Sequence, residues 1–319
     1  MHLTTNYNKD FIGQAVCAIK AGYLVAFPTE TVYGLGADAM NKMAVSRIYE
    51  VKGRPNDHPL IIHVSSVNKI DRWVNKIPDY AVKLGTNFWP GPMTLILPRS
   101  RIAKDFITGG QDSVALRVPQ HSIALQLIRG FEDLGGHGLA APSANRFGAV
   151  SPTDAAAVLD ELGDYLSNQD MVLDGGKSEI GLESTIIDCT TEEPRILRPG
   201  FVSSEMIEDI TGLGVTSPTK YFDKRAPGLL ANHYAPKAKV VLDAPALHGD
   251  GFLAMGNIAT PSGAFRLGSP TDLLQFAKDL YSVFRLADHK KFHRIVVIQP
   301  QGAGLAEAIR DRLGKAAAQ

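Results

Sequence analysis

Hydrophobic and polar positions follow two alternating patterns along most of the chain, one typical of buried strands and one typical of amphipathic helices. The runs YLVAF (residues 23–27) and LIIHV (residues 60–64) are short, apolar and β-rich, and turn residues bound each of them, which predicts two buried strands. Between them, Asn41 can cap a helix that Gly53 ends. This order of elements favours an α/β fold.

The same patterns continue to about Gly200. Further strands are predicted at residues 94–98, 114–118, 138–142, 170–174, 184–190 and 195–198. Helices are predicted at residues 9–21, 66–75, 79–87, 121–130, 152–162 and 203–211. Because several strands between residues 170 and 198 follow one another without a helix, we expect a twisted mixed sheet with flanking helices.

Regular periodicity fails from residue 211 to residue 236, where Gly, Pro, Ser, Thr and Lys are frequent. We interpret this stretch as a linker between a first domain (residues 1–210) and a smaller second domain (residues 237–319). In the second domain the pattern predicts strands at residues 239–243, 251–255 and 294–298 and helices at residues 271–287 and 304–316. Such an order predicts a small Rossmann-like α/β unit with a parallel sheet.

Composition narrows the possible functions. The 319 residues suit two domains, and 33 basic residues balance 33 acidic ones, so tight binding to nucleic acid is not expected, although a local basic pocket is compatible with this balance. Cys17 and Cys189 are far apart and form no CxxC motif, which indicates neither a disulfide framework nor a zinc site. No signal-like or membrane-spanning run occurs, so we expect a cytoplasmic protein without membrane contact.

Candidate polar groups are densest in FPTETVYGLGADAM and KGRPNDHPLIIHV, between residues 27 and 64, where strands and helices end. Lys52 and Arg54 follow the predicted helix as a compact charge and a planar fork, a pair that suits a polyphosphate or a carboxylate. Each of these candidates also has an ordinary structural interpretation. A Lys-x-Arg pair is often a solvated helix end, and a histidine such as His63 in an apolar strand is often a hydrogen-bonded core residue.

Other candidates stand at later strand ends. Ser143 and Asn145 follow the apolar run GLAAP, and Arg198 precedes a Pro-Gly pair; the alternatives are a plain turn and a surface arginine. Arg117 alternates with apolar neighbours in VALRVP and is suited to grip a carboxylate. Ser184 offers a hydroxyl in GLESTII.

Several familiar devices are absent from the sequence. It has no GxxxxGK[ST] loop and no GxSxG elbow, and GLG lacks the third glycine of a dinucleotide fingerprint. His289 and His293 lie four apart without the zincin glutamate, so no metal-ligating residue is predicted. An ATP-using enzyme of this sequence would hold phosphates with Lys, Arg, hydroxyls and backbone amides instead.

Taken in order, the motifs closely resemble the YrdC-like family of threonylcarbamoyl-AMP synthases. They are PTETVYGLG, KGRP, HPLIIHV, WPGPMTLIL, VALRVP, APSAN, DGG, GLESTIID and ILRPG. They cover about two-thirds of the chain, so residues 1–210 resemble a YrdC-like catalytic domain. APGLLANHYAP (residues 226–236) and GAGLAEAIRDRL (residues 302–313) resemble the longer, two-domain branch.

The resemblance implies an enzyme that condenses L-threonine, bicarbonate or CO2 and ATP, with Mg2+, into threonylcarbamoyl-AMP and pyrophosphate. The product would pass to the machinery that forms N6-threonylcarbamoyladenosine in tRNA. The positions that match the family's threonine site are Thr29, His63, Arg117 and Ser184. The positions that match its nucleotide and phosphate site are Lys52, Arg54, His58, Ser113, Ser143, Asn145, Ser151, Arg198 and Tyr234.

The chemistry implied is an attack by the threonine carbamate on the α-phosphorus of ATP. A closed site would favour the neutral amine by desolvation. Lys52 and Arg54, as catalytic residues, would then offset charge on the phosphates together with Arg198 and Mg2+. We also expect His233 and Tyr234 in the HYAP segment to fold over the cleft as a lid. For this segment, the alternative is that Tyr234 only packs the second domain onto the first. The alternatives are an RNA-binding module and a carbamoyltransferase of the same fold.

Overall fold

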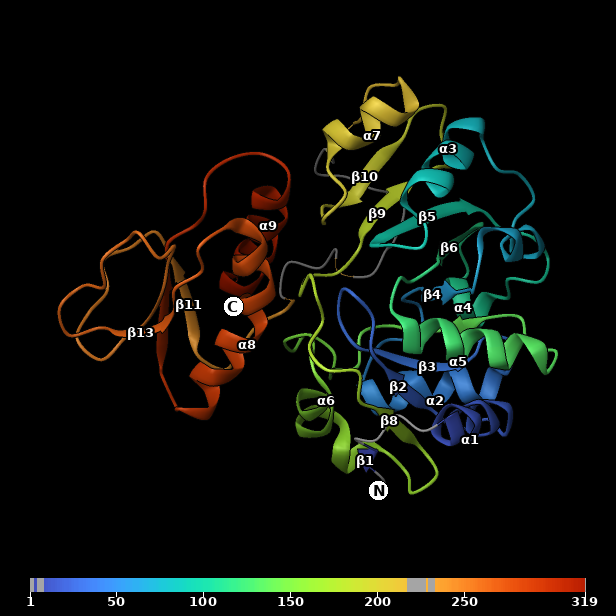
Figure 1. The fold of residues 1–319 in the computed structure, drawn as a ribbon, viewed down its shortest axis with the longest axis horizontal. Coiled ribbons are helices and arrows are strands. Elements are labelled where there is room, and N and C mark those ends of the chain that lie inside the picture. The colour runs from blue at the N-terminus through green and yellow to red at the C-terminus, as the bar shows by residue number, and fades with distance from the viewer. Residues whose placement is uncertain (1–2, 5–8, 217–227, 229–232, 319) are drawn as a thin grey trace.

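The chain folds into two α/β domains that lie side by side (Figure 1). The structure is a computed structural model, and it describes residues 3–4, 9–216, 228 and 233–318. The larger domain is built on a ten-stranded sheet and the smaller one on a four-stranded sheet. Among the described residues, no helix combines the length and the apolar character that crossing a membrane requires.

The large sheet is mixed, as the sequence predicts. Its strands, in spatial order, are β1 (Leu3–Thr4), β8 (Met171–Leu173), β2 (Val25–Phe27), β3 (Gly34–Asp38), β7 (Leu139–Ala140), β4 (Ile61–His63), β6 (Ser113–Arg117), β5 (Met93–Pro98), β9 (Thr185–Asp188) and β10 (Arg195–Arg198). β4 runs parallel to β6, and β5 runs parallel to β9, whereas β5 and β6 are antiparallel. The carboxyl ends of β4 and β6 therefore open at the same edge.

Helices pack against this sheet close to the predicted positions, except that a short helix at residues 105–108 was not predicted. They are α1 (Lys9–Lys20), α2 (Lys42–Lys52), α3 (Asp79–Phe88), α4 (Asp105–Thr108), α5 (Ser122–Asp133), α6 (Ala155–Leu162) and α7 (Ser204–Thr211), with a 3-10 turn, η3, at Gly163–Tyr165. Asn41 caps α2 by accepting bonds from the backbone N–H groups of Met43 and Ala44, both at 3.1 Å, and Gly53 ends the helix in the left-handed conformation at φ 62°. Both capping predictions are confirmed.

The helix predicted at residues 66–75 is wrong. The structure has two 3-10 turns there, η1 (Val67–Lys69) and η2 (Asp71–Trp73). The apolar side chains of Val67, Ile70 and Trp73 recur every three residues, and all three pack on the main core. A spacing of three matches the three residues per turn of a 3-10 helix and not the 3.6 of an α-helix.

Three strands were not predicted: β1, which is only two residues long, β3 and β13 (Phe265–Gly268). β3 reads GLGAD and lacks the apolar alternation of a strand. It needs its glycines because a Cβ at Gly36 would lie 2.8 Å from the Phe27 ring on the neighbouring strand. β13 lies at an edge of its sheet and is partly exposed, so its pattern is weak.

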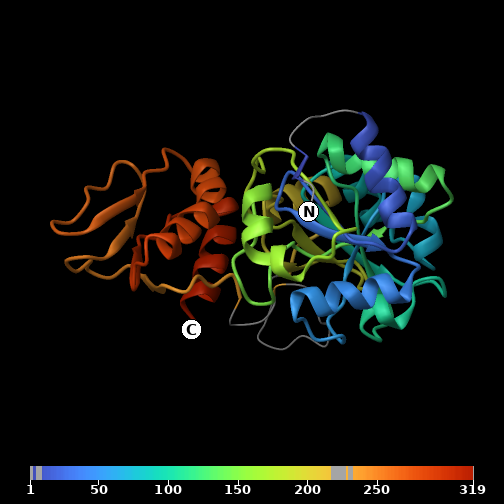
Figure 2. The same cartoon turned by 90° about the horizontal axis from the view of Figure 1, so that it is seen from below.

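The smaller domain has an entirely parallel sheet, as predicted. The strands, in spatial order, are β11 (Lys239–Leu242), β14 (Arg294–Val297), β12 (Gly251–Leu253) and β13. Its two helices, α8 (Leu273–His289) and α9 (Leu305–Ala317), face the large domain (Figure 1). Seen from below, α6 of the large domain lies next to them (Figure 2).

The two domains share a hydrophobic cluster. Val32, Val150 and Leu182 of the large domain pack with Phe276 and Leu280 of α8. This mixed core fixes the small domain against the loops that surround the open edge of the large sheet. Residues 217–227 and 229–232 of the predicted linker lie outside the described residues, so the boundaries 1–210, 211–236 and 237–319 stay a prediction.

Candidate active site

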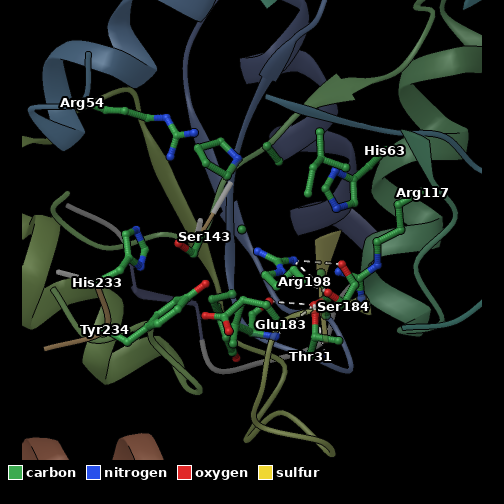
Figure 3. A pocket seen from close by; sticks show the side chains of 18 residues that line it. Thr31, Arg54, His63, Arg117, Ser143, Glu183, Ser184, Arg198, His233 and Tyr234 are labelled. Atoms are coloured by element: carbon green, nitrogen blue, oxygen red, sulfur yellow. Dashed lines mark hydrogen bonds between the residues drawn. The ribbon is translucent and has the colours of Figure 1, made fainter. Parts of the chain in front are cut away.

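A cavity lies where the strand ends of the large sheet meet the HYAP segment (Figure 3). Eighteen residues line it. The space inside that is open to a water-sized molecule is only about 50 Å³, well below the ~300 Å³ of a typical ligand pocket. In this conformation the site is therefore nearly closed.

All four predicted threonine-site residues line the cavity. His63 and Arg117 end two parallel strands and are paired with each other in the register of β4 and β6. Thr29 follows β2 and Ser184 precedes β9, and both are buried. Burial, together with the nearby charge of Arg117, lowers the pKa of His63 to about 3. The imidazole is thus neutral at physiological pH and carries no charge into this part of the cavity.

Arg117 has a protein partner that the sequence did not indicate. Its Nη2 lies 2.8 Å from Oε1 of the buried Glu30. Neither of these two atoms makes an aligned hydrogen bond with a described residue. The guanidinium is held by charge attraction to Glu30 and by a hydrogen bond from Nε to the carbonyl oxygen of Gly91 at 3.4 Å. Its Nη2 donor is still available to a carboxylate ligand.

The other predicted lining residues are Arg54, Ser143, Arg198 and Tyr234, and they too face the cavity (Figure 3). Arg198 donates from Nε and Nη2 to the carbonyl oxygen of Ser184 at 3.1 and 2.9 Å. Arg54 donates to the carbonyl oxygen of Pro59 at 3.0 Å, while its buried Nε has no hydrogen-bond partner among the described residues. Burial lowers the pKa of Arg54 to about 10, so the group stays charged.

Three predicted nucleotide residues form a layer behind the lining. Lys52 is buried and donates from Nζ to the carbonyl oxygens of Ser143, at 2.6 Å, and Asn145. The Asn145 amide donates to the carbonyl oxygens of Arg146 and Ala149. Burial, followed by the charge of Arg54, lowers the pKa of Lys52 well below its ordinary value. Ser151 donates to Glu183, at 2.6 Å.

His58 and Ser113 do not line the cavity. The His58 ring packs edge-on against Phe147 at 5.4 Å. Ser113 begins β6, at the opposite end of the strand from Arg117. Their assignment to the nucleotide stays a prediction.

The HYAP segment forms part of the wall. Gly228, His233 and Tyr234 all line the cavity. The His233 ring lies 4.2 Å from that of Tyr234 and 6.0 Å from that of Phe147. Burial lowers the pKa of His233 to about 3, so this ring is also neutral. The remainder of residues 226–236 is only partly within the described range.

Among the charged residues of the lining, the one that was missed is the buried carboxylate of Glu183. Burial alone would raise the pKa of this carboxyl, but the charges of Arg312 and Arg198 and the bond from Ser151 lower it to about 2. The GLES motif places an acid beside Ser184, which was a usable signal. Nothing in that motif points to Arg312, which lies 129 residues away.

Three arginines, several hydroxyl groups and two neutral histidines line this almost closed cavity. Within the described part of the chain, no three His, Cys, Asp or Glu side chains are grouped as a metal site. Such a composition defines a site for small anionic substrates in a two-domain α/β protein.

Comparison with known proteins gives the family. The family model of the Sua5, YciO and YrdC proteins, described as telomere recombination, matches residues 17–200. A second model, described as the threonylcarbamoyl-AMP synthase C-terminal domain, matches residues 202–318. The chain belongs to the Sua5–YciO–YrdC family and has the two-domain architecture of Sua5.

Individual relatives agree with this assignment. The chain is 40% identical to a threonylcarbamoyl-AMP synthase of Pyrococcus abyssi, over 93% of this chain and 91% of the relative. It is 36% identical to the Bacillus subtilis enzyme of the same name, over 97% and 94%. A solved structure of P. abyssi Sua5 complexed with L-threonine superposes with a TM-score of 0.87 at 38% identity, covering 98% of this chain and 95% of that one.

Proposed function

We propose that this protein is a threonylcarbamoyl-AMP synthase. It condenses L-threonine, bicarbonate or CO2 and ATP into threonylcarbamoyl-AMP and pyrophosphate, and the product serves N6-threonylcarbamoyladenosine formation in tRNA. We expect it to act in the cytoplasm and to hand its product to a tRNA-modifying partner. The observation that carries the proposal is that eight of the residues matched to the family's threonine and nucleotide sites line one cavity: Thr29, Arg54, His63, Arg117, Ser143, Ser184, Arg198 and Tyr234.

The threonine half of the site is the wall with His63 and Arg117. Arg117 binds the substrate carboxylate through its available donor, and the hydroxyls of Thr29 and Ser184 serve the polar groups of the amino acid. His63 is neutral, so it adds no positive charge that would oppose the ammonium group. The dry surroundings favour the neutral amine, which is the form that attacks CO2 or bicarbonate.

The nucleotide half is the wall with Arg54, Ser143 and Arg198. The buried Nε of Arg54 is suited to a phosphate oxygen. Burial lowers the pKa of Lys52, but a bound polyphosphate favours the charged form of this amine, so Lys52 adds positive charge behind Ser143 when ATP is bound. The carbamate oxygen attacks the α-phosphorus, a P–O bond forms, and the bond to pyrophosphate breaks. Lys52, Arg54 and Arg198 stabilise the charge that develops on the leaving pyrophosphate.

Mg2+ enters as part of the MgATP substrate. The nearest carboxylate in the lining, Glu183, already accepts bonds from Ser151, Tyr281 and Arg312. The ion would therefore keep mainly phosphate and water ligands, which is how Mg2+ is commonly bound beside nucleotides.

ATP is larger than the closed cavity, so the wall made by Gly228, His233 and Tyr234 has to open for entry. When it closes again, it excludes water from the labile adenylate. We infer that this wall acts as the lid that the HYAP motif predicts.

Pyrophosphate release that depends on threonine and bicarbonate tests the function. A threonylcarbamoyl-AMP synthase releases pyrophosphate only when all three substrates are present. An RNA-binding module would release none, and a carbamoyltransferase would require carbamoyl phosphate in place of bicarbonate. Absence of threonine-dependent release from the intact protein would contradict the proposal.

A further inference from the structure

An arginine of the small domain reaches the wall of the large domain's cavity. Arg312 lies on α9 and is fully buried. Its Nε lies 2.8 Å from Oε2 of Glu183, and its Nη2 donates to the carbonyl oxygen of Pro199 at 3.0 Å. Glu183 precedes Ser184 and Pro199 follows Arg198. One side chain of the small domain therefore touches the neighbours of two cavity residues.

Glu183 is the centre of a network that joins several segments. Oε1 accepts from Ser151 at 2.6 Å, and Oε2 accepts from the Tyr281 hydroxyl of α8 at 2.9 Å and from Arg312. Both carboxylate oxygens are satisfied, so Glu183 is held in one orientation. A buried carboxylate with these partners fixes the backbone that leads into Ser184.

The same two side chains of the small domain support the lid. The Arg312 guanidinium lies over the Tyr234 ring at 5.2 Å, and Tyr234 stacks on Tyr281 with centroids 5.8 Å apart. Arg312 and Tyr281 thus contact the lid, the strand end beside Arg198 and the carboxylate beside Ser184 at once.

We propose that Arg312 and Tyr281 are positioning residues, through which the small domain sets the geometry of the catalytic cavity. They act through Glu183, Pro199 and Tyr234 and touch no substrate themselves. The site is then incomplete without α8 and α9. This inference rests on the proposed function.

The domain interface also offers a matched control. Arg285 on α8 bridges the same two domains: its Nη1 lies 3.0 Å from Glu161, and its Nη2 donates to the carbonyl oxygen of Val150. Among the described residues, its hydrogen bonds and ion pair go to Glu161 and Val150, and not to Glu183 or Tyr234. Arg285→Gln weakens docking in general, whereas Arg312→Gln removes docking and positioning together.

The experiment measures threonine-dependent pyrophosphate release by full-length variants, with KM for each substrate. We expect Arg312→Gln to lower kcat/KM about thirtyfold or more, because it leaves a buried carboxylate without its charged partner. Arg312→Lys keeps the charge and should recover part of that loss. Arg285→Gln should stay close to wild type. Tyr281→Phe removes one hydroxyl at nearly constant volume and should reduce kcat while the protein stays folded.

A pH profile separates positioning from mere folding support. The charged or titratable groups that face Glu183 are Arg198, Tyr234, His233, Tyr281 and Arg312. Without Arg312 the carboxyl protonates more readily, so Arg312→Gln should lose activity on acidification at a higher pH than wild type. Tyr281→Phe serves the same purpose if Arg312→Gln proves insoluble.

The outcomes are distinct. Equal activity and an unchanged pH profile for the Arg312, Tyr281 and Arg285 variants would overturn the positioning role. Equal losses for all three would show general docking only and would also overturn it. Wild-type protein without threonine-dependent release would instead contradict the proposed function itself.

Discussion

The two walls of the cavity are built in different ways. The wall with His63 and Arg117 consists of two adjacent parallel strands whose terminal residues are paired in register. The opposite wall brings together Glu183, the HYAP segment and helices from another domain. The first wall is fixed by backbone hydrogen bonds within one sheet. The second exists only while the two domains are docked, so binding of threonine and closure over the nucleotide depend on different parts of the fold.

The largest loss of activity is expected when Lys52, which lies behind the proposed phosphate-binding residues, is replaced. Lys52→Ala should lower pyrophosphate release by a factor of about 10² to 10³, because it removes a buried positive charge and leaves the carbonyl oxygens of Ser143 and Asn145 unpaired. Lys42→Ala is the matched control, since Lys42 is exposed on the same helix. A Lys52 variant with close to full activity would remove this residue from the mechanism.

A smaller and selective loss is expected on the strand-built wall. Arg117→Ala should weaken threonine binding about tenfold or more while ATP affinity changes little, since a charged hydrogen bond to the carboxylate contributes about 1.5–3 kcal/mol. Titration calorimetry with each ligand measures this difference. Equal losses for both ligands would mean that Arg117 mainly balances Glu30 and supports the fold.

On the domain-built wall, the lid gives the next effect. The double variant His233→Ala with Tyr234→Ala should release the adenylate faster and accumulate less of it, because two rings that close the cavity are lost. Product retained after rapid gel filtration, with thermal unfolding as a control, is the measurement. Retention equal to that of the intact protein would leave the segment as a tether.

The smallest expected effect is on how the free energy of unfolding depends on pH. His63 and His233 have pKa values of about 3 in the folded protein against an ordinary 6.5. The unfolded chain therefore binds more protons between pH 3 and pH 6.5, so the free energy of unfolding is highest above pH 6.5 and falls on acidification. Between pH 6 and pH 5 each histidine should contribute a slope of about 1.2 kcal/mol per pH unit, because the unfolded imidazole is only partly protonated at pH 6. In denaturant titrations His63→Gln should flatten the slope, and an unchanged slope would contradict a neutral buried His63.

The strand-built wall is also the part that the sequence predicts best. The strand predicted at residues 60–64 contains β4 (Ile61–His63), and the strand predicted at residues 114–118 matches β6 (Ser113–Arg117) within one residue. Local alternation and turn residues are enough to find such elements. Local patterns fail where tertiary packing determines the structure. At β3, glycine is required because a side chain at Gly36 would collide with the Phe27 ring.

The site residues also fall into two groups: those that the local sequence indicates and those whose role depends on tertiary contacts. Arg117 was predicted from the alternation in VALRVP, and His63 was singled out in the strand LIIHV, with its place in the threonine site implied by the family motifs. The pairing of these two strands, which brings the two residues together, was not predicted. The role of Glu183 was not predicted, because its partners Tyr281 and Arg312 are 98 and 129 residues away. Such contacts follow from how two domains dock, which a single sequence does not reveal.

The central claim is that the two walls hold the two substrates in one cavity. The most direct test is a crystal structure of the protein soaked with ATP and L-threonine. The account predicts density for the threonine carboxylate at Arg117 and for the triphosphate between Arg54 and Arg198, with His233 and Tyr234 over both. Density for either ligand outside this cavity, or for the triphosphate at the wall with His63 and Arg117, would contradict it.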